Sequence, residues 1–251
     1  MQNSILLIIA EEMKKYNINV FEEIQQSLNG LQGNIHILEA TIPIEQQKAF
    51  FNYAEIVRSS RREGVVEEYI KILNSEAVPL ENKRYAMVFL SISADIKAFR
   101  ALEKYNQSPQ KELSNWASLA LLQARMILEN ELSDEEQIFV STGLGGKGDR
   151  FRFFAFLKSK DLIPFSNYQR NLIEKEMDFS VHKHYGEMEK MEIKSNYFTL
   201  LLLSTFKVIR TTISSAVEEC NKYGGFIDHD FVITNMEIFN EEDIQKELNK
   251  E

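Results

Sequence analysis

The hydrophobic and polar positions from residue 150 onward change period along the chain. Apolar runs of strand length lie at 152–157, 188–193, 198–203 and 231–236. Stretches with helical spacing separate the first run from the second and the third run from the fourth. The expected order of elements is therefore strand, helix, strand, strand, helix, strand.

The helices of this region have recognisable ends. Ser166 and Gln169 form a capping-box pattern that predicts the start of the first helix, and Gly186 predicts its end. The second helix carries an apolar stripe within 209–220. After the last strand, a short polar helix is expected from about Asn240.

Residues 44–132 carry helical spacing with few interruptions. The clearest stripe has members three, four or seven positions apart: Leu113, Trp116, Ala117, Ala120, Leu121, Ala124 and Leu128. A second stripe passes through 85–92, and aligning Tyr85 with Trp116 gives an offset of 31 residues (116 − 85), close to one helix-turn-helix repeat. The sequence predicts a helical domain that is either a repeat array or an irregular bundle.

Both regions resemble known folds. With its alternation of long and short helices and its faces rich in Ala and Leu, the stretch 63–132 resembles HEAT or armadillo-like helical repeats. The order of elements after residue 150 resembles the ferredoxin-like βαββαβ fold, in which the first and third strands are central and the second lies at an edge. The expected edge strand suits that place, because Glu187, Glu189, Lys190 and Glu192 would discourage stray strand pairing.

Glycines concentrate between the two regions, with four of them in the span 143–148. Glycine-rich segments that break both periods are typical of domain boundaries. We therefore expect an α+β protein with an N-terminal all-helical (HEAT-like repeat or bundle) domain at 1–140, a Gly-rich linker at 141–149 and a ferredoxin-like α/β-sandwich domain at 150–251.

The expected inner strands are apolar on both faces. On the first strand Phe151, Phe153 and Ala155 point to one side, and on both strands apolar residues also fall on the other side. Because monomers rarely expose a large apolar patch, we expect this second face to be covered by the helical domain, a second subunit or a ligand. The expected interaction surface consists of Arg152, Phe154, Phe156, Lys158, Leu201 and Leu203.

Charge and composition narrow the partners. The 44% hydrophobic and 27% charged residues are those of a globular protein, and the net charge of −9 disfavours nucleic acid. RNA-recognition modules of this topology stack bases on aromatics of the first and third strands. Phe154 and Phe156 imitate the first component, but the leucines of 200–203 offer no ring on the other strand.

The single cysteine and the short apolar runs indicate in which cellular compartment the protein is expected. Cys220 is the only cysteine, so an intrachain disulfide is excluded and a reducing compartment fits. The apolar runs at 5–10 and 200–203 are too short to span a bilayer, and the first lacks the basic residue that precedes a signal peptide core. We expect a cytoplasmic protein without membrane contact.

Candidate chemistry is sparse. Gly143 to Lys147 places a lysine after glycines, but Gly148 follows that lysine and a strand comes next, which does not match a phosphate-binding P-loop. A flexible linker, or alternatively a backbone anion nest, is expected there. His182, His184 and the triplet Asp228, His229 and Asp230 are the candidate polar cluster, for which solvated helix-end and loop positions are expected.

These observations predict no catalytic residue, metal or cofactor. We expect a non-enzymatic protein–protein interaction or adaptor protein that binds a protein partner or a second copy of itself through the sheet, as a homodimer in the latter case. One alternative is a small-molecule sensor, because regulatory domains of ACT type resemble this topology and bind ligands at subunit interfaces. A second alternative is a protein that binds single-stranded nucleic acid on the sheet face. A third is an enzyme, which would require the residues of the candidate polar cluster to converge in one pocket.

Overall fold

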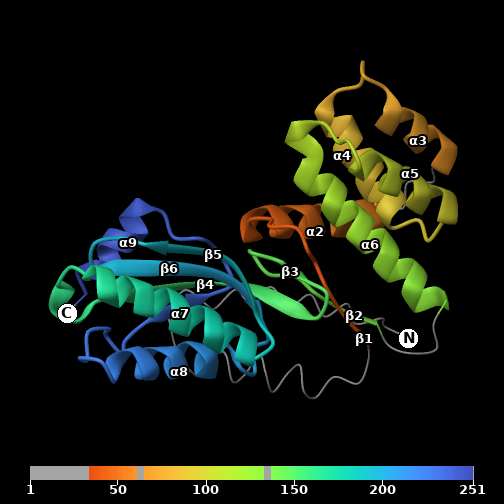
Figure 1. Cartoon of the computed structure of the whole chain (residues 1–251). Coiled ribbons are helices and arrows are strands. Elements are labelled where there is room, and N and C mark those ends of the chain that lie inside the picture. Colours follow the sequence, from red (N-terminus) through yellow and green to blue (C-terminus); the bar gives the residue numbers. More distant parts are fainter. Residues whose placement is uncertain (1–33, 61–64, 133–136, 251) are drawn as a thin grey trace. The chain divides into compact units, whose positions relative to one another are not determined.

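The computed structural model describes residues 34–60, 65–132 and 137–250 (Figure 1). The apolar run at 5–10 lies outside the described residues. The chain is a mixed α+β protein. Its described residues divide into two compact units, one ending at Val140 and the other beginning at Ser141.

Helices make up most of the first unit. They are α2 (Ile44–Ser59), α3 (Val66–Asn74), α4 (Leu80–Ser91), α5 (Ile96–Asn106), the short 3-10 helix η1 (Lys111–Leu113) and α6 (Ser114–Leu132). Pro43 and Pro79 stand directly before α2 and α4, where a missing N–H costs nothing. The side chain of Asp95 caps α5 by accepting from the backbone N–H groups of Lys97 and Ala98.

The apolar stripe expected on α6 is confirmed. Leu113, Ala117, Ala120 and Ala124 are buried in the core of this unit, and Trp116 and Leu121 pack against the same core. The small alanines allow α4 and α6 to approach closely. A buried hydrogen bond of 2.7 Å from Ser91 Oγ to Gln123 Oε1 joins these two helices.

The first unit also contains strands, which corrects the expected all-helical domain. Strand β1 (Asn34–Ile37) pairs in parallel with β2 (Gln137–Val140), one before the helices and the other after them. Each strand has four residues, and their pairing joins segments about a hundred positions apart. Local periodicity carries no information on such a pairing, which depends on how the intervening helices fold.

The second unit contains the remaining elements. They are β3 (Gly146–Lys147), β4 (Arg150–Lys158), the 3-10 helix η2 (Lys160–Leu162), α7 (Asn167–Lys183), β5 (Glu187–Ile193), β6 (Tyr197–Ser204), α8 (Ile209–Asn221), β7 (Val232–Thr234) and α9 (Glu241–Leu248). The predicted capping box at the start of α7 is present, with reciprocal bonds between Ser166 and Gln169. The last strand is shorter than the expected 231–236.

The sheet has the expected central and edge strands. β4 lies between β6 and β7, β6 lies between β4 and β5, and every pair is antiparallel. Helices α7 and α8 cover one face of this sheet, and α9 lies on the other face (Figure 1). Ser180 Oγ of α7 donates to the carbonyl of Thr212 of α8 at 2.8 Å, which ties the two covering helices together.

The glycine-rich segment expected to be a linker packs within the second unit. Ser141, Thr142 and Leu144 are buried, and β3 forms a tight hairpin with β4. Leu144 N donates to the carbonyl of Asn235 at 3.0 Å, just after β7. The glycines here allow two backbone segments to approach closely, so the segment is structural and not an open tether.

Candidate interaction surface

The six residues of the expected interaction surface lie on one face of the sheet. Phe154 of β4 stands opposite Leu201 of β6, and Arg152 stands opposite Leu203. Directly opposite residues of an antiparallel pair point to the same side, and alternation brings Phe156 and Lys158 to that side as well. The structure therefore brings all six together, on the face that carries α9.

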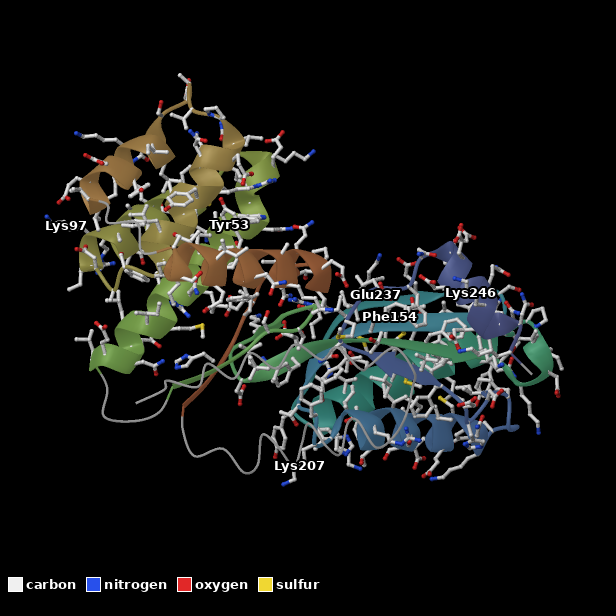
Figure 2. All side chains as sticks on the ribbon, turned by 180° about the vertical axis from the view of Figure 1, so that it is seen from behind. Tyr53, Lys97, Phe154, Lys207, Glu237 and Lys246 are labelled. Carbon is white, nitrogen blue, oxygen red and sulfur yellow. The ribbon has the colours of Figure 1, made fainter. Side chains whose placement is uncertain are left out.

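A C-terminal segment of the same chain covers this face. Phe154 and Phe156 form a buried cluster with Leu144 and Phe239, and the ring centroids of Phe154 and Phe239 are 5.1 Å apart. The half-buried members of the cluster include Tyr197, Leu201, Val232, Ile244 and Leu248. We call residues 239–250 the C-terminal cover. Figure 2 labels Phe154 on the sheet and Lys246 on the cover.

The expectation that the second face is covered is confirmed. Phe154 is 4% exposed and Phe156 2% exposed. The C-terminal cover is not one of the three covers that the sequence suggested, because its helix is polar apart from Ile244 and Leu248. While the cover is in place, neither phenylalanine ring can stack on a nucleic-acid base or meet another subunit.

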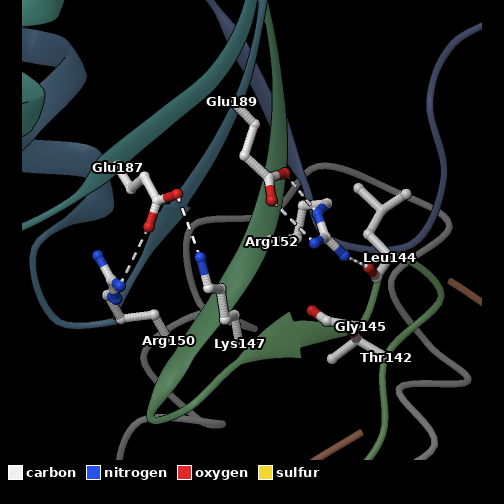
Figure 3. Close-up of polar contacts among 8 residues, drawn as sticks. All are labelled: Thr142, Leu144, Gly145, Lys147, Arg150, Arg152, Glu187 and Glu189. Carbon is white, nitrogen blue, oxygen red and sulfur yellow. Dashed lines mark hydrogen bonds and ion pairs between the residues drawn. The ribbon is translucent and has the colours of Figure 1, made fainter. Parts of the chain in front are cut away.

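Arg152 holds three segments of the second unit together (Figure 3). Its Nε and Nη2 donate to the two carboxylate oxygens of Glu189 on β5 at 2.5 and 2.9 Å, and its Nη1 donates to the carbonyl of Leu144 at 2.7 Å. The Arg152 and Glu189 side chains are only 17% and 23% exposed, so water screens this bidentate pair little. Arg152 therefore fixes the glycine-rich segment against the sheet.

The other cations beside the glycines are also paired. Lys147 Nζ and Arg150 Nη2 lie 3.4 and 3.3 Å from the two carboxylate oxygens of Glu187 (Figure 3). Arg150 Nη1 also donates to the carbonyl of Tyr185. Glu187 and Glu189 of the edge strand thus each face a cation from the β3–β4 hairpin, whereas Glu192 pairs with Lys190 and Lys194. This pairing favours a structural role for the segment over the anion nest considered above.

Lys158, at the other end of β4, contacts the cover itself. Its Nζ donates to the carbonyl of Lys250 at 3.1 Å. Because one lysine hydrogen bond near solvent contributes little, this contact orients the end of the cover more than it holds it in place.

The candidate polar cluster does not assemble. His182 and His184 end α7, and Tyr185 beside them is bonded by Arg150, the first residue of β4. Asp228 N donates to the carbonyl of Lys158, the last residue of β4. The histidines and the 228–230 loop therefore lie at opposite ends of a nine-residue strand, roughly 25 Å apart.

In each of these two groups, the side chains bond to groups close by in the sequence. His182 Nδ1 and His184 Nδ1 lie 2.8 and 2.9 Å from backbone carbonyls of α7. His229 Nε2 lies 3.3 Å from Nδ2 of Asn221, and Asp228 accepts from the backbone N–H of Asp230. In the ranges 34–60, 65–132 and 137–250, no three His, Cys, Asp or Glu side chains are placed to hold a metal ion together.

The only cysteine, Cys220, has a strongly shifted pKa. It is fully buried on α8. Desolvation, followed by the nearby carboxylates of Glu176 and Glu219, raises the pKa of its thiol from 9.0 to about 12. A thiol of this kind is protonated at neutral pH and is a poor nucleophile, so Cys220 acts as a small apolar core residue.

The Cys220 pKa predicts a loss of stability in alkali. Between pH 9 and 12 the unfolded thiol releases its proton while the folded thiol keeps it, so the free energy of unfolding falls as pH rises, by up to about 1.4 kcal/mol per pH unit. Urea unfolding at several pH values would measure the slope. Subtracting the curve of Cys220→Ala removes the contribution of lysines and tyrosines, and parallel curves would contradict the shift.

The first unit carries an aromatic surface that the sequence pattern assigned to its core. Trp116 is half-buried, with the ring of Tyr53 5.6 Å away, the ring of Phe50 5.3 Å away beneath it and the guanidinium of Arg84 5.2 Å from its centroid. We call Tyr53, Arg84 and Trp116 the Trp116 cluster; Tyr53 is labelled in Figure 2. The spacing of the stripe does not distinguish Trp116 from the fully buried members of the stripe.

Arg84 is incompletely satisfied at this surface. Its Nη1 lies 3.3 Å from Glu81 Oε2, a long pair between partly exposed side chains. Its Nε is buried without a hydrogen-bond acceptor. A buried donor that lacks an acceptor costs free energy.

No helix among the described residues is long and apolar enough to cross a membrane. No model of a known protein family matches the chain, and no curated protein matches it. A crystal structure of a "putative transposase" from Deinococcus radiodurans R1 is similar over 41% of this chain and 92% of that chain, with 11% identical residues and a TM-score of 0.35. A similarity at this level carries no functional argument.

Proposed function

We propose that this chain is a non-enzymatic protein–protein interaction protein of the cytoplasm, and that its helical unit binds the partner through the Trp116 cluster. The observation that carries the proposal is the half-buried Trp, Tyr and Arg side chains of that cluster, which α6, α2 and α4 bring together. These three residue types dominate the energetics of protein interfaces.

The rigidity of the cluster favours binding. Tyr53 and Phe50 both meet the Trp116 ring nearly edge-on, with interplanar angles of 70° and 72°. Phe50 is fully buried and belongs to the core of the unit. Because the core fixes the rings in advance, a partner would order few side chains on binding, which preserves more of the contact free energy as affinity.

The packing of the helices supports a HEAT-like assignment for this unit. Helix α3 packs on α4 and α5 on α6, while α3 also packs on α5 and α4 on α6. Two stacked helical hairpins have these contacts, and repeat proteins built from such hairpins use their outer surfaces for binding. In the second unit, the order β7-β4-β6-β5 with two helices on one face supports a ferredoxin-like assignment.

The proposal predicts that Arg84→Ala weakens partner binding while the fold survives. Loss of a central interface residue of this type costs about 2 kcal/mol or more, which weakens the dissociation constant about 30-fold. Wild-type and variant chains would be used to capture proteins from the source cells, and any protein lost with Arg84→Ala would be purified. Because Trp116 is the only tryptophan, its fluorescence then reports directly on binding.

Arg100→Ala is a matched control on the same unit. Arg100 lies 5.8 Å from the Phe99 ring and pairs with Glu103, as Arg84 does with Trp116 and Glu81, but its side chain is 68% exposed on another helix. This variant should capture the same partner as wild type. The proposal fails if every captured protein binds Arg84→Ala as well as wild type, or if the purified partner leaves Trp116 fluorescence unchanged.

A further inference from the structure

We propose that the C-terminal cover is a reversible cover of the β4–β6 face, and that two copies of this chain associate by exchanging it. In the exchanged pair, residues 239–250 of one copy occupy the face of the other. One chain contains both the sheet face and the segment that fits it, so each of two identical copies can bind the cover of the other. This inference does not depend on the Trp116 cluster.

The cover is attached to the sheet through side chains. Phe239, Ile244 and Leu248 pack on Phe154 and Phe156, and the backbone hydrogen bonds of α9 run within the helix, as from Ile244 N to Asn240 O. Such an attachment can separate without breaking a strand ladder. Helix α9 has only eight residues, which is too short to be stable alone, so it is folded because it is seated on an apolar face.

The helix nevertheless carries strong end signals of its own. Asn240 and Asp243 form a complete capping box, and acidic residues occupy the first turn. Lys246 pairs with Asp243, and Lys250 with Glu247, each three residues apart. These contacts lie within the segment and do not depend on the rest of the chain, so the segment can form the same helix on a second copy.

A short hinge separates the cover from the anchored part of the chain. Before it, Asn235 O accepts from Leu144 N, and Thr234 Oγ1 accepts from Met236 N. Residues 237 and 238 are exposed, with Ile238 53% exposed. A segment that joins its domain through an exposed hinge can be exchanged at low cost, because the closed and exchanged forms share every contact except those of the hinge.

A second copy is the occupant favoured by the chemistry of the face. The buried rings fit the Phe239 side chain, while Tyr197 and Leu201 beside them remain half-exposed in the closed form. In the exchanged pair, residues 239–250 of the other copy make the same contacts with these residues. No nucleic acid or peptide of other composition is needed to complete the surface.

Shortening the hinge tests the exchange directly. Deleting residues 237 and 238 shortens the tether by about 7 Å, so the cover can no longer return to its own face. Light scattering on the full chain should then give a dimer, and insertion of five Gly and Ser residues after Ile238 should give a monomer. A folded, monomeric deletion variant would overturn the proposal.

Phe239→Asp separates exchange from other association. Placed in the deletion variant, it removes the ring that fills the face and should abolish the dimer; a dimer that survives is held elsewhere, and the proposal is then wrong. If the deletion variant does not fold, hydrogen exchange on the wild-type chain decides. Amides of α9 should exchange at least tenfold faster than those of β6, and equal protection would mean that the cover opens only with the whole fold.

Discussion

Alanine at Phe153 and alanine at Phe154 are each expected to lower the free energy of unfolding by about 3 to 5 kcal/mol. The two residues are neighbours on β4 and point to opposite faces of the sheet. Phe153 is fully buried on the side of α7 and α8, and Phe154 is 4% exposed beneath the C-terminal cover. Urea unfolding followed by circular dichroism would measure both losses.

The comparison of these two variants tests whether both faces of the sheet exclude water. Phe179→Ala is the control, because that ring is 63% exposed on α7 and its loss should change stability by no more than about 0.5 kcal/mol. A cost below about 1 kcal/mol at Phe154, with several kcal/mol at Phe153, would mean that water reaches the face beneath the cover. Both residues are phenylalanines on the same strand. The difference between their losses of stability therefore reports on how well the C-terminal cover excludes water from its face.

The order of elements in the second unit could be predicted because each signal is local. The capping box at Ser166 and Gln169 acts within one helical turn, and the apolar alternation of 152–157 acts within one strand. The charges on β5 also indicated an edge strand correctly. In each case a few consecutive residues carry the physical cause of the structure.

The cover and the β1–β2 pair could not be predicted, because their cause is not local. Residues 241–248 contain only two large apolar side chains among charged ones, a pattern that describes an exposed helix equally well. Burial of Ile244 and Leu248 depends on a sheet face that includes Phe154 of β4, which lies 94 positions before Leu248 in the sequence (248 − 154). The parallel pair likewise depends on the helices between its strands.

The candidate sites divide in the same way. Residue alternation brought Arg152, Phe154, Phe156 and Lys158 to one face correctly, but it could not show that Arg152 is engaged by Glu189 and Leu144. For the histidines and the 228–230 loop, the sequence predicted solvated helix-end and loop positions, and only the enzyme alternative required them to converge in one pocket. The register of β4 separates them, since one group lies at its first residue and the other at its last.

Gly143→Ala is expected to lower the free energy of unfolding by about 3 kcal/mol or more, a large effect for one added methyl group. A Cβ at this position would lie 1.7 Å from the carbonyl oxygen of Met236 and 2.6 Å from its carbon. Both are backbone atoms, so no side chain can rotate away. Either the glycine-rich segment or the residues after β7 must shift.

The shift would break specific contacts of the second unit. Leu144 N would lose its 3.0 Å hydrogen bond to Asn235 O, and the Leu144 side chain would leave the cluster beneath the C-terminal cover. Arg152 would lose the carbonyl that it bonds at 2.7 Å. Thermal and urea unfolding would measure the loss, and hydrogen exchange that is faster than wild type in β7 and α9 but unchanged in α8 would locate it.

Gly148→Ala is the control, because it separates a steric clash from backbone strain. Gly148 has φ +62°, and an added Cβ would meet nothing within 4 Å. The free energy of unfolding should fall only by the cost of placing alanine in the left-handed region, about 1–2 kcal/mol. Hydrogen exchange in β7 and α9 should stay as in the wild-type chain. Equal losses for the two variants would mean that the glycine-rich segment is not packed against residue 236, and that it is the flexible linker its composition first indicated.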